Sequence, residues 1–221
     1  MGADVVASLA GATRRPDPLP VPTRIGGFGG EDGFRATLAK LGIIAVVDAT
    51  HPFADVITHR SARVCADMGL PYLHVLRPSW VPQTGDDWMF IASPRDAAAH
   101  IPEAATVFLA TGRQTLDAYA NLAGRRVLLR VIDPPREPFP FDGGEYVVGR
   151  PPFTQDQEKA LFEALGVTHL VVKNAGGDGG RAKLDAARQL SLPVLVLERP
   201  VMPQSARVET VEDALAWVRA L

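Results

Sequence analysis

The sequence is poor in the features that mark several protein classes. Its 221 residues include one cysteine, Cys65, which excludes an internal disulfide and a cysteine-rich zinc site. The formal net charge is -2, from 23 Lys and Arg against 25 Asp and Glu, so the basic surface of a nucleic-acid-binding protein is not indicated. The longest apolar stretch, Leu41 to Val47, is interrupted by Gly42 and is far shorter than the roughly 18 residues of a membrane-spanning helix. The start of the chain carries Asp4 and no basic segment, so no signal peptide is expected. These absences favour a cytoplasmic globular protein with neither a membrane nor a nucleic-acid partner.

Two catalytic classes also lack their motifs. The sequence Gly-x-Ser-x-Gly, which marks the nucleophile elbow of many hydrolases, does not occur. No two histidines have the spacing of metal ligands on one helix, so no metal is expected. Cys65 falls inside a predicted helix, where a buried thiol is the more frequent role.

Short runs rich in β-branched residues alternate with helical patterns along the chain. Ile43–Val47, Thr106–Ala110 and Val167–Lys173 are predicted strands, and Thr154–Leu165 is a predicted helix that begins with a capping box. This alternation is typical of βαβ units and parallel sheets. The sequence therefore predicts an α/β protein of two lobes that meet near residues 90–105.

Loops at predicted strand ends carry the unusual composition, and in open α/β sheets ligands bind beyond the carboxyl ends of strands. The loop Ser8–Arg15 contains two adjacent arginines, which suit the 2′-phosphate of a dinucleotide but are equally explained as solvated side chains. Gly26–Gly30 has four glycines in five residues, which allows a backbone to approach a ligand closely. It fits neither the dinucleotide fingerprint nor a Walker loop, so it identifies no ligand.

A third loop, Asp48–Ala54, directs a hydroxyl and an imidazole toward the same crevice. Pro52 suits the first turn of the helix that follows. His51 could act as a general acid or as a hydrogen-bond donor to a ligand, and a structural histidine is the alternative.

The fourth loop, Lys173–Lys183, contains a Gly-x-Gly-x-x-Ala reading from Gly177 to Ala182. Glu198 follows Gly177 by 21 residues, which matches the dinucleotide pattern for NAD. Three cations, Lys173, Arg181 and Lys183, favour a carboxylate-rich ligand instead. The pattern alone thus predicts a protein that binds an anionic small molecule, with a nucleotide as the favoured cofactor.

The run Val47–Ala54, with the sequence Val-Asp-Ala-Thr-His-Pro-Phe-Ala, carries the most specific resemblance to a known family. Leu76–Trp80 follows it, and further segments are similar in the same order: Ser8–Gly11, Gly26–Gly30, Leu129–Pro135, Gly149–Phe153, Val172–Gly177 and Lys183–Arg188. Together these segments resemble the precorrin-6A reductases of cobalamin biosynthesis over essentially the whole chain. The resemblance implies two Rossmann-like lobes with mainly parallel sheets, an NADPH-binding lobe over residues 1–97 and a substrate lobe over 98–221, with the active site in the cleft between them. It also implies NADPH-dependent reduction of one macrocycle double bond, which yields precorrin-6B.

The resemblance also assigns roles to individual residues. His51 is the candidate proton donor, with solvent as the alternative. Precorrin-6A bears many acetate and propionate groups, which call for distributed cations rather than a positively charged protein. The expected cofactor-binding residues are Ser8, Gly11, Thr13, Arg14, Gly27, Phe28, Gly29, Thr50, His51 and Pro52. The expected substrate-binding residues are Arg77, Arg113, Arg130, Arg150, Lys173, Asn174, Gly176 and Gly177.

Two departures from the family pattern leave alternatives open. Ala175 stands where the family usually has serine, so a hydroxyl contact to ligand is not expected there. Family members usually open with an apolar strand and a Gly-Gly-Thr loop that holds part of the cofactor, whereas this chain begins at what reads as the second strand. We therefore expect either that the natural protein begins further upstream or that this chain is deficient in cofactor binding. A cobalt-precorrin-6A reductase of the anaerobic branch and a non-catalytic tetrapyrrole- or nucleotide-binding protein are the alternatives, and the oligomeric state is not predicted.

Overall fold

The computed structural model describes residues 4–11 and 18–221. The chain divides into two compact units, which are called unit 1 (Met1–Pro78 with Pro200–Leu221) and unit 2 (Ser79–Arg199). The expected boundary between residues 97 and 98 therefore falls inside unit 2. The reason is strand pairing: β5 (Trp88–Ile91) pairs with β10 (Val194–Leu197), while the end of the chain returns to pair in unit 1.

Unit 2 contains one six-stranded sheet in which every pairing is parallel. The strand order is β5-β10-β9-β6-β7-β8, so the chain proceeds outward from β6 to β8 and then returns to the other side of β6 at β9. The topology therefore switches direction between β6 and β9, which is where open α/β sheets bind ligands. The remaining strands are β6 (Thr106–Ala110), β7 (Arg126–Val131), β8 (Gly144–Val148) and β9 (His169–Lys173).

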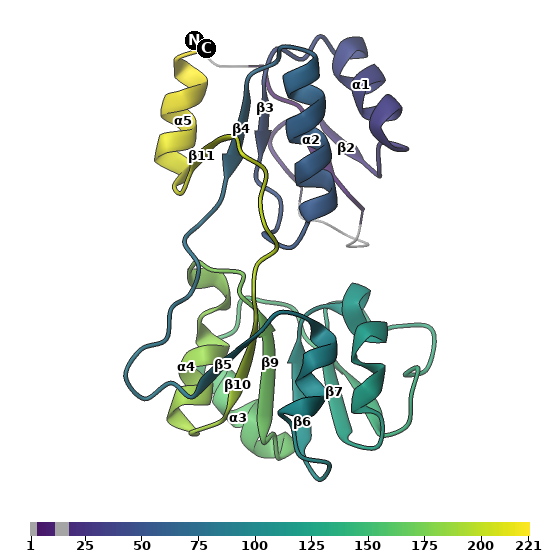
Figure 1. Cartoon of the computed structure of the whole chain (residues 1–221), viewed down its shortest axis with the longest axis vertical. Coiled ribbons are helices and arrows are strands. Elements are labelled where there is room, and N and C mark those ends of the chain that lie inside the picture. The colour runs from purple at the N-terminus through teal and green to yellow at the C-terminus, as the bar shows by residue number, and fades with distance from the viewer. Residues whose placement is uncertain (1–3, 12–17) are drawn as a thin grey trace. The chain divides into compact units, whose positions relative to one another are not determined.

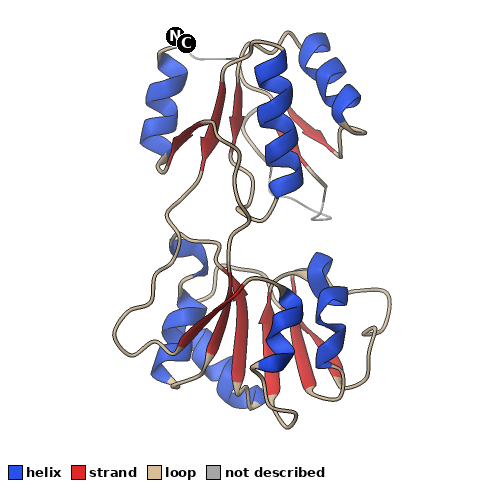
Figure 2. Ribbon diagram, in the orientation of Figure 1, coloured by secondary structure: helices blue, strands red, loops and turns tan. Residues whose placement is uncertain are grey.

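Helices flank this sheet (Figure 2). The α-helices are α3 (Gln155–Leu165) and α4 (Ala182–Gln189), and the 3-10 helices are η1 (Pro94–Ala99), η2 (Arg113–Leu122) and η3 (Asp178–Gly180). The predicted capping box of α3 is confirmed: Thr154 Oγ1 accepts from the Gln157 amide at 3.2 Å, and the Gln157 side chain accepts from the Thr154 amide at 2.9 Å. Such a cap satisfies amides that the first helical turn leaves without partners.

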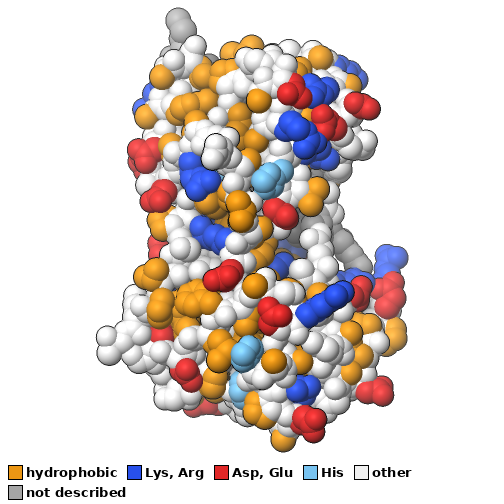
Figure 3. Space-filling model, in the orientation of Figure 1, with side chains coloured by type: hydrophobic (Ala, Val, Ile, Leu, Met, Phe, Trp, Pro, Cys, Tyr) orange, Lys and Arg blue, Asp and Glu red, His pale blue; other side chains and the backbone are white. Residues whose placement is uncertain are grey.

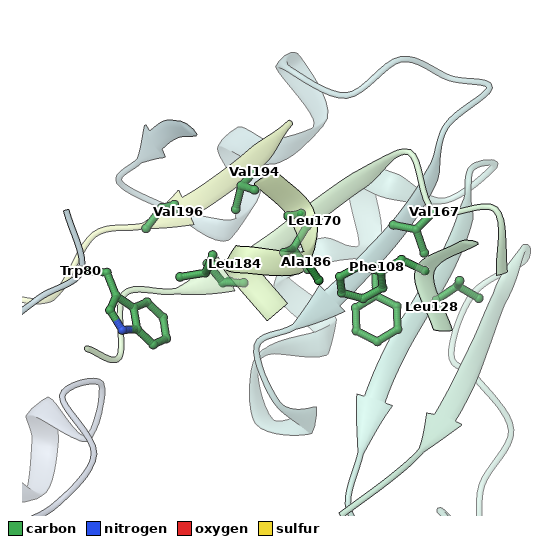
Figure 4. Close-up of a cluster of buried hydrophobic side chains, with 12 residues drawn as sticks. Trp80, Phe108, Leu128, Val167, Leu170, Leu184, Ala186, Val194 and Val196 are labelled. Carbon is green, nitrogen blue, oxygen red and sulfur yellow. The ribbon is translucent and has the colours of Figure 1, made fainter. Parts of the chain in front are cut away.

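The core of unit 2 explains why its strands were visible in the sequence. Phe108, Leu128 and Leu170 lie on adjacent strands and are fully buried (Figure 4). The Phe108 and Phe162 rings pack edge to face, with their centroids 5.1 Å apart. Parallel strands covered on both faces read as continuous apolar runs. The predicted α/β fold with mainly parallel sheets is confirmed.

Unit 1 has two separate parallel ladders, one with the order β11-β4-β3 and one that pairs β1 with β2. Its strands are β1 (Ala7–Leu9), β2 (Thr23–Ile25), β3 (Val46–Asp48), β4 (Tyr72–Val75) and β11 (Ala206–Val208), and its helices are α1 (Glu31–Lys40), α2 (Asp55–Asp67) and α5 (Val211–Arg219) (Figure 1). Among the described residues, β3 is an edge strand. The expectation that this lobe lacks a central strand stays a prediction.

Candidate functional site

Arg24, at the centre of β2, connects two of the loops expected to bind the cofactor. Its guanidinium donates to Ser8 Oγ at 2.7 Å and to the carbonyl oxygens of Gly26 at 3.0 Å and Gly27 at 2.9 Å. It also stacks on the Phe28 ring, 4.0 Å from the ring centroid. Arg24 thus fixes the glycine loop against β1, a role the sequence analysis missed. The available signal was a lone arginine in a strand just before a glycine cluster.

The glycine loop itself faces open space. A Cβ atom added at Gly26, Gly27, Gly29 or Gly30 would meet no atom within 4 Å, so packing does not require these glycines. Gly26, Gly29 and Gly30 have φ angles of 118°, 74° and 102°, a region that glycine tolerates and other residues rarely adopt. The Gly26 amide already donates to the Leu9 carbonyl at 2.8 Å, whereas Gly27, Gly29 and Gly30 are exposed. Gly33 differs: its added Cβ would lie 1.8 Å from the Phe28 carbonyl oxygen, so glycine allows α1 to pack against the loop.

The Thr50–Phe53 loop is held from behind by a buried carboxylate. Asp48, 5% exposed, accepts from the Thr50 amide at 2.9 Å and from the Tyr72 hydroxyl at 2.7 Å. Thr50 Oγ1 lies 3.0 Å from Thr58 Oγ1. Burial, together with the Asp48 carboxylate, raises the pKa of Tyr72, so this hydroxyl stays protonated and continues to donate.

His51 is exposed at the tip of this loop, and its Nδ1 accepts from the Phe53 amide at 3.2 Å. The neutral ring then carries its proton on Nε2. Pro52 is buried but precedes α2, which begins at Asp55, so the expectation that Pro52 forms the first helical turn is wrong. The chain makes a separate turn there, in which the Ala54 amide donates to the His51 carbonyl at 2.7 Å. Thr13 and Arg14 lie outside the described residues.

Unit 2 contains a pocket of about 210 Å³ beyond the carboxyl ends of β6, β7 and β8. Its lining includes Gly112, Arg130, Gly149, Phe153, Glu158 and Lys183. These residues come from β7, from the segments that follow β6 and β8, from α3 and from the first turn of α4. The pocket therefore lies beside the topological switch point.

Arg130 lines the pocket and forms a buried ion pair with Glu158. Its Nη1 lies 2.6 Å from Glu158 Oε1, and the two side chains are only 10% and 2% exposed. The Phe108 and Phe153 rings also lie near the guanidinium, at 4.9 Å and 4.3 Å from their centroids. Removing either residue of such a buried pair would strongly destabilise the fold, because an uncompensated buried charge would remain. Arg130 was expected to bind substrate through its charge, but Glu158 already neutralises that charge.

Lys183 is the third charged side chain of the pocket. Its Nζ donates to the Gly180 carbonyl at 2.9 Å and lies 5.9 Å from the centroid of the Trp80 ring. Burial lowers the pKa of Lys183, the nearby Glu158 carboxylate raises it and Arg130 lowers it. The sequence analysis named Lys183 only as one of three cations in its loop.

Asn174, which is expected to contact substrate, forms two hydrogen bonds with the backbone of Trp80. Its Oδ1 accepts from the Trp80 amide at 2.8 Å and its Nδ2 donates to the Trp80 carbonyl at 3.1 Å. The Trp80 indole donates to the Gly177 carbonyl at 2.6 Å, and Arg199 donates to the carbonyls of Asn174 and Ala175. Gly176 and Gly177 both have φ angles of 69°. The loop after β9 is thus tied to Trp80 and Arg199 from within unit 2.

The other expected substrate-binding cations are distributed. Arg113 pairs with Glu137 at 2.7 Å and Arg150 pairs with Asp133 at 3.3 Å, both at exposed positions where ion pairs are weak and readily exchanged. Lys173 is partly buried, and burial lowers its pKa. Arg77 belongs to unit 1. On the face shown in Figure 3, acidic and basic side chains are interspersed.

Residues 4–11 and 18–221 contain no group of three or more His, Cys, Asp or Glu side chains that could hold a metal ion. Within the same residues, no helix has the length and apolar character needed to cross a membrane.

Comparison with known proteins identifies relatives along the whole chain. The precorrin-6A reductase of Rhodobacter capsulatus is 40% identical over 218 residues, which cover 98% of this chain and 87% of that protein. The precorrin-6A reductase of Rhodococcus erythropolis is 43% identical over 225 residues, which cover 100% of this chain and 89% of that protein. The cobalt-precorrin-6A reductase of Priestia megaterium is more distant, at 27% identity over 187 residues, 79% of this chain and 72% of that protein.

A solved structure described as CobK precorrin-6A reductase matches with a TM-score of 0.93 at 40% identity, and the match covers 97% of this chain and 86% of that one. Residues 1–219 match the family model described as Precorrin-6x reductase CbiJ/CobK. The chain belongs to this family of precorrin-6x reductases, which act as oxidoreductases on a carbon–carbon double bond.

Proposed function

We propose that this protein is a precorrin-6A reductase that uses NADPH to reduce one double bond of the macrocycle and yields precorrin-6B. The observation that carries the proposal is identity of 36–43% over nearly the whole chain to proteins named precorrin-6A reductase. Proteins named cobalt-precorrin-6A reductase are only 26–29% identical over a smaller share of the chain. That difference favours the metal-free macrocycle over its cobalt-containing counterpart.

The loops of unit 1 fit a dinucleotide. Pyrophosphate recognition uses backbone amides that glycine leaves accessible, and the Gly26–Gly30 loop presents its backbone to open space. The first turn of α1 carries Glu31 and Asp32, and Glu31 already pairs with Arg35 and Arg63. Acidic side chains thus occupy the positive end of that helix dipole, so the loop amides are the better phosphate partners. We assign Ser8, Gly11, Gly27, Phe28, Gly29 and Thr50 to dinucleotide binding. Thr13 and Arg14 are assigned to it from the sequence alone.

NADPH would supply the hydride, and the chain must supply position and a proton. His51 suits the proton transfer because its ring is exposed at the loop tip while Asp48 anchors the loop behind it. A positioned general acid typically contributes about 10²- to 10⁴-fold to a rate. The substrate is a polycarboxylate, and the distributed cations Arg113, Arg150 and Lys173 suit its acidic side chains.

Steady-state kinetics test the proposal. The full chain should oxidise NADPH only when precorrin-6A is present, with a higher kcat/KM than for cobalt-precorrin-6A assayed in parallel. A higher kcat/KM for the cobalt macrocycle would assign the protein to the anaerobic reaction. Binding of both NADPH and macrocycle without oxidation would support a non-catalytic binding protein and would contradict the proposal.

A further inference from the structure

We propose that the unit 2 pocket binds one carboxylate side chain of the substrate, with Lys183 as its charge partner and the Arg130–Glu158 pair as the rigid wall beside it. The identity of the ligand rests on the proposed function. The preference for a single carboxylate rests on the pocket itself, so the two can be tested separately.

The charged side chains that line the pocket do not balance one another. Arg130 and Lys183 are positive and Glu158 is negative, so the cluster carries one net positive charge. Glu158 Oε1 pairs with Arg130 Nη1 at 2.6 Å. Within the described chain, Lys183 Nζ donates a hydrogen bond to the carbonyl of Gly180, which is a neutral partner. Charges taken out of water are normally paired. One carboxylate bound at Lys183 would neutralise the cluster.

The charge count also discriminates between anions. A phosphate dianion would exceed the single positive charge and would place two negative charges beside Glu158, whose side chain is 2% exposed. Repulsion between like charges is strong where water cannot screen them. A monoanionic carboxylate avoids that cost.

The wall of the pocket also contains buried polar atoms without hydrogen-bond partners in the described part of the chain. Arg130 Nε is buried and, among the described residues, has no partner. Glu158 Oε2 is likewise buried without a partner in that part of the chain. Buried polar atoms of this kind are costly unless a ligand or water completes them. A carboxylate that enters between Lys183 and Arg130 can accept from the Nε–H of Arg130.

The pocket is large enough for a side chain of the substrate and is lined in part by an aromatic ring. The pocket of about 210 Å³ is far larger than the roughly 10–15 Å³ that a single water requires on the same measure. Two glycines keep its aromatic neighbours in place: an added Cβ would lie 3.0 Å from Phe153 Cζ at Gly149 and 2.9 Å from the Trp80 ring at Gly180. Phe153 then offers an apolar surface for methylene groups. A short aliphatic arm that ends in a carboxylate, such as an acetate or propionate group, matches this combination.

A pair of matched variants tests the role of Lys183 in the reaction. Lys183→Gln removes the pocket charge, and Lys159→Gln removes the same charge from α3, where Lys159 is 40% exposed and only 3.9 Å from Glu163. Loss of one charge-assisted bond should raise KM for precorrin-6A about 10- to 100-fold in Lys183→Gln. KM for NADPH should not change, and Lys159→Gln should behave as the parent. Equal KM values for precorrin-6A in the two variants would overturn the proposal.

Trp80 provides a readout that does not depend on activity. The chain has three tryptophans, so replacing Trp88 and Trp217 by Phe leaves Trp80 as the fluorescent reporter next to Lys183. Propionate should change its emission saturably, whereas neutral propionamide should not, and Lys183→Gln should abolish the response. A response to both probes alike, or one that survives in Lys183→Gln, would refute the pocket assignment even in an active reductase. A propionate-specific, Lys183-dependent response without reductase activity would support the pocket and contradict only the proposed function.

Discussion

The two units share one class of fold but differ in how firmly their sheets are enclosed. In unit 2, one continuous sheet has central strands whose apolar residues, such as Phe108, Leu128 and Val171, are fully buried. In unit 1, two unconnected ladders of three- and four-residue strands leave Ile25 60% and Val47 43% exposed. The unit 2 pocket therefore adjoins a buried frame, while in the His51 loop the Thr50 amide donates to Asp48 and the Phe53 amide donates to His51 Nδ1. Stability and function should consequently respond differently to mutation in the two units.

The largest expected effect is on folding stability. Phe108→Ala removes a fully buried ring between β6 and α3 and should cost about 3–5 kcal/mol in the free energy of unfolding. Val47→Ala, at a half-exposed edge strand of unit 1, should cost about 1 kcal/mol or less. Urea denaturation measures both values. Equal losses would show that the two frames are equally well packed.

The next effect separates catalysis from stability. His51→Gln should lower kcat about 10²-fold or more if the imidazole donates the proton, because a positioned acid contributes that much. Its thermal midpoint should stay close to that of the parent, since the ring is exposed and contributes little packing. Calorimetry and steady-state assays on the same preparation check both values. Loss of stability with unchanged kcat would make His51 a structural residue.

Cys65 offers a probe of opening in unit 1. Burial, with a smaller contribution from Asp48, raises the pKa of this thiol to about 11. Its thiolate fraction at mild alkaline pH should then be roughly a hundredfold below that of a free thiol, since each pKa unit is a factor of ten. Iodoacetamide labelling should be correspondingly slow in the folded protein and fast in urea. Equally fast labelling in both conditions would show that α2 opens readily.

The smallest expected effect concerns the pH dependence of stability. Burial lowers the pKa of Lys183 below its usual 10.5, so the unfolded chain binds more protons between the folded pKa and 10.5. Stability conferred by the wild-type lysine should therefore rise with pH through that window. Lys183→Met, which lacks the titration, should be the more stable protein at neutral pH and should lose this advantage as the pH rises. A constant difference between the two proteins would contradict the burial of the ammonium.

Several of these features were visible in the sequence, and the others depend on distant contacts. The strands β6 and β9 were predicted because burial on both faces requires unbroken apolar runs. The edge strands β5 and β11 were missed: Met89 and Phe90 of β5 are 45% and 43% exposed, and β11 has only three residues. The domain boundary was misplaced because local patterns do not reveal that the end of the chain pairs with β4.

The site shows the same division. Loop composition singled out Gly26–Gly30, where an added Cβ at Gly26, Gly27, Gly29 or Gly30 would meet no atom within 4 Å, and its role in cofactor binding stays a prediction. Composition could not show that Arg130 is neutralised by Glu158, 28 residues further along the chain, or that Asn174 is occupied by Trp80. Charge alone suggested Arg130 as an anion-binding residue, and its pairing with the buried Glu158 depends on a contact that composition does not reveal.

The most direct test is whether deuterium moves from NADPH to the macrocycle, because the proposed reductase transfers a hydride between them. The full chain should be incubated with precorrin-6A and NADPH that carries deuterium at the transferable position of the nicotinamide, and the macrocycle should be analysed by mass spectrometry. The account predicts that the deuterium moves to the macrocycle as NADPH is oxidised, with one solvent proton added at the neighbouring carbon. Oxidation of NADPH that leaves the macrocycle unlabelled, or an unchanged macrocycle, would contradict it.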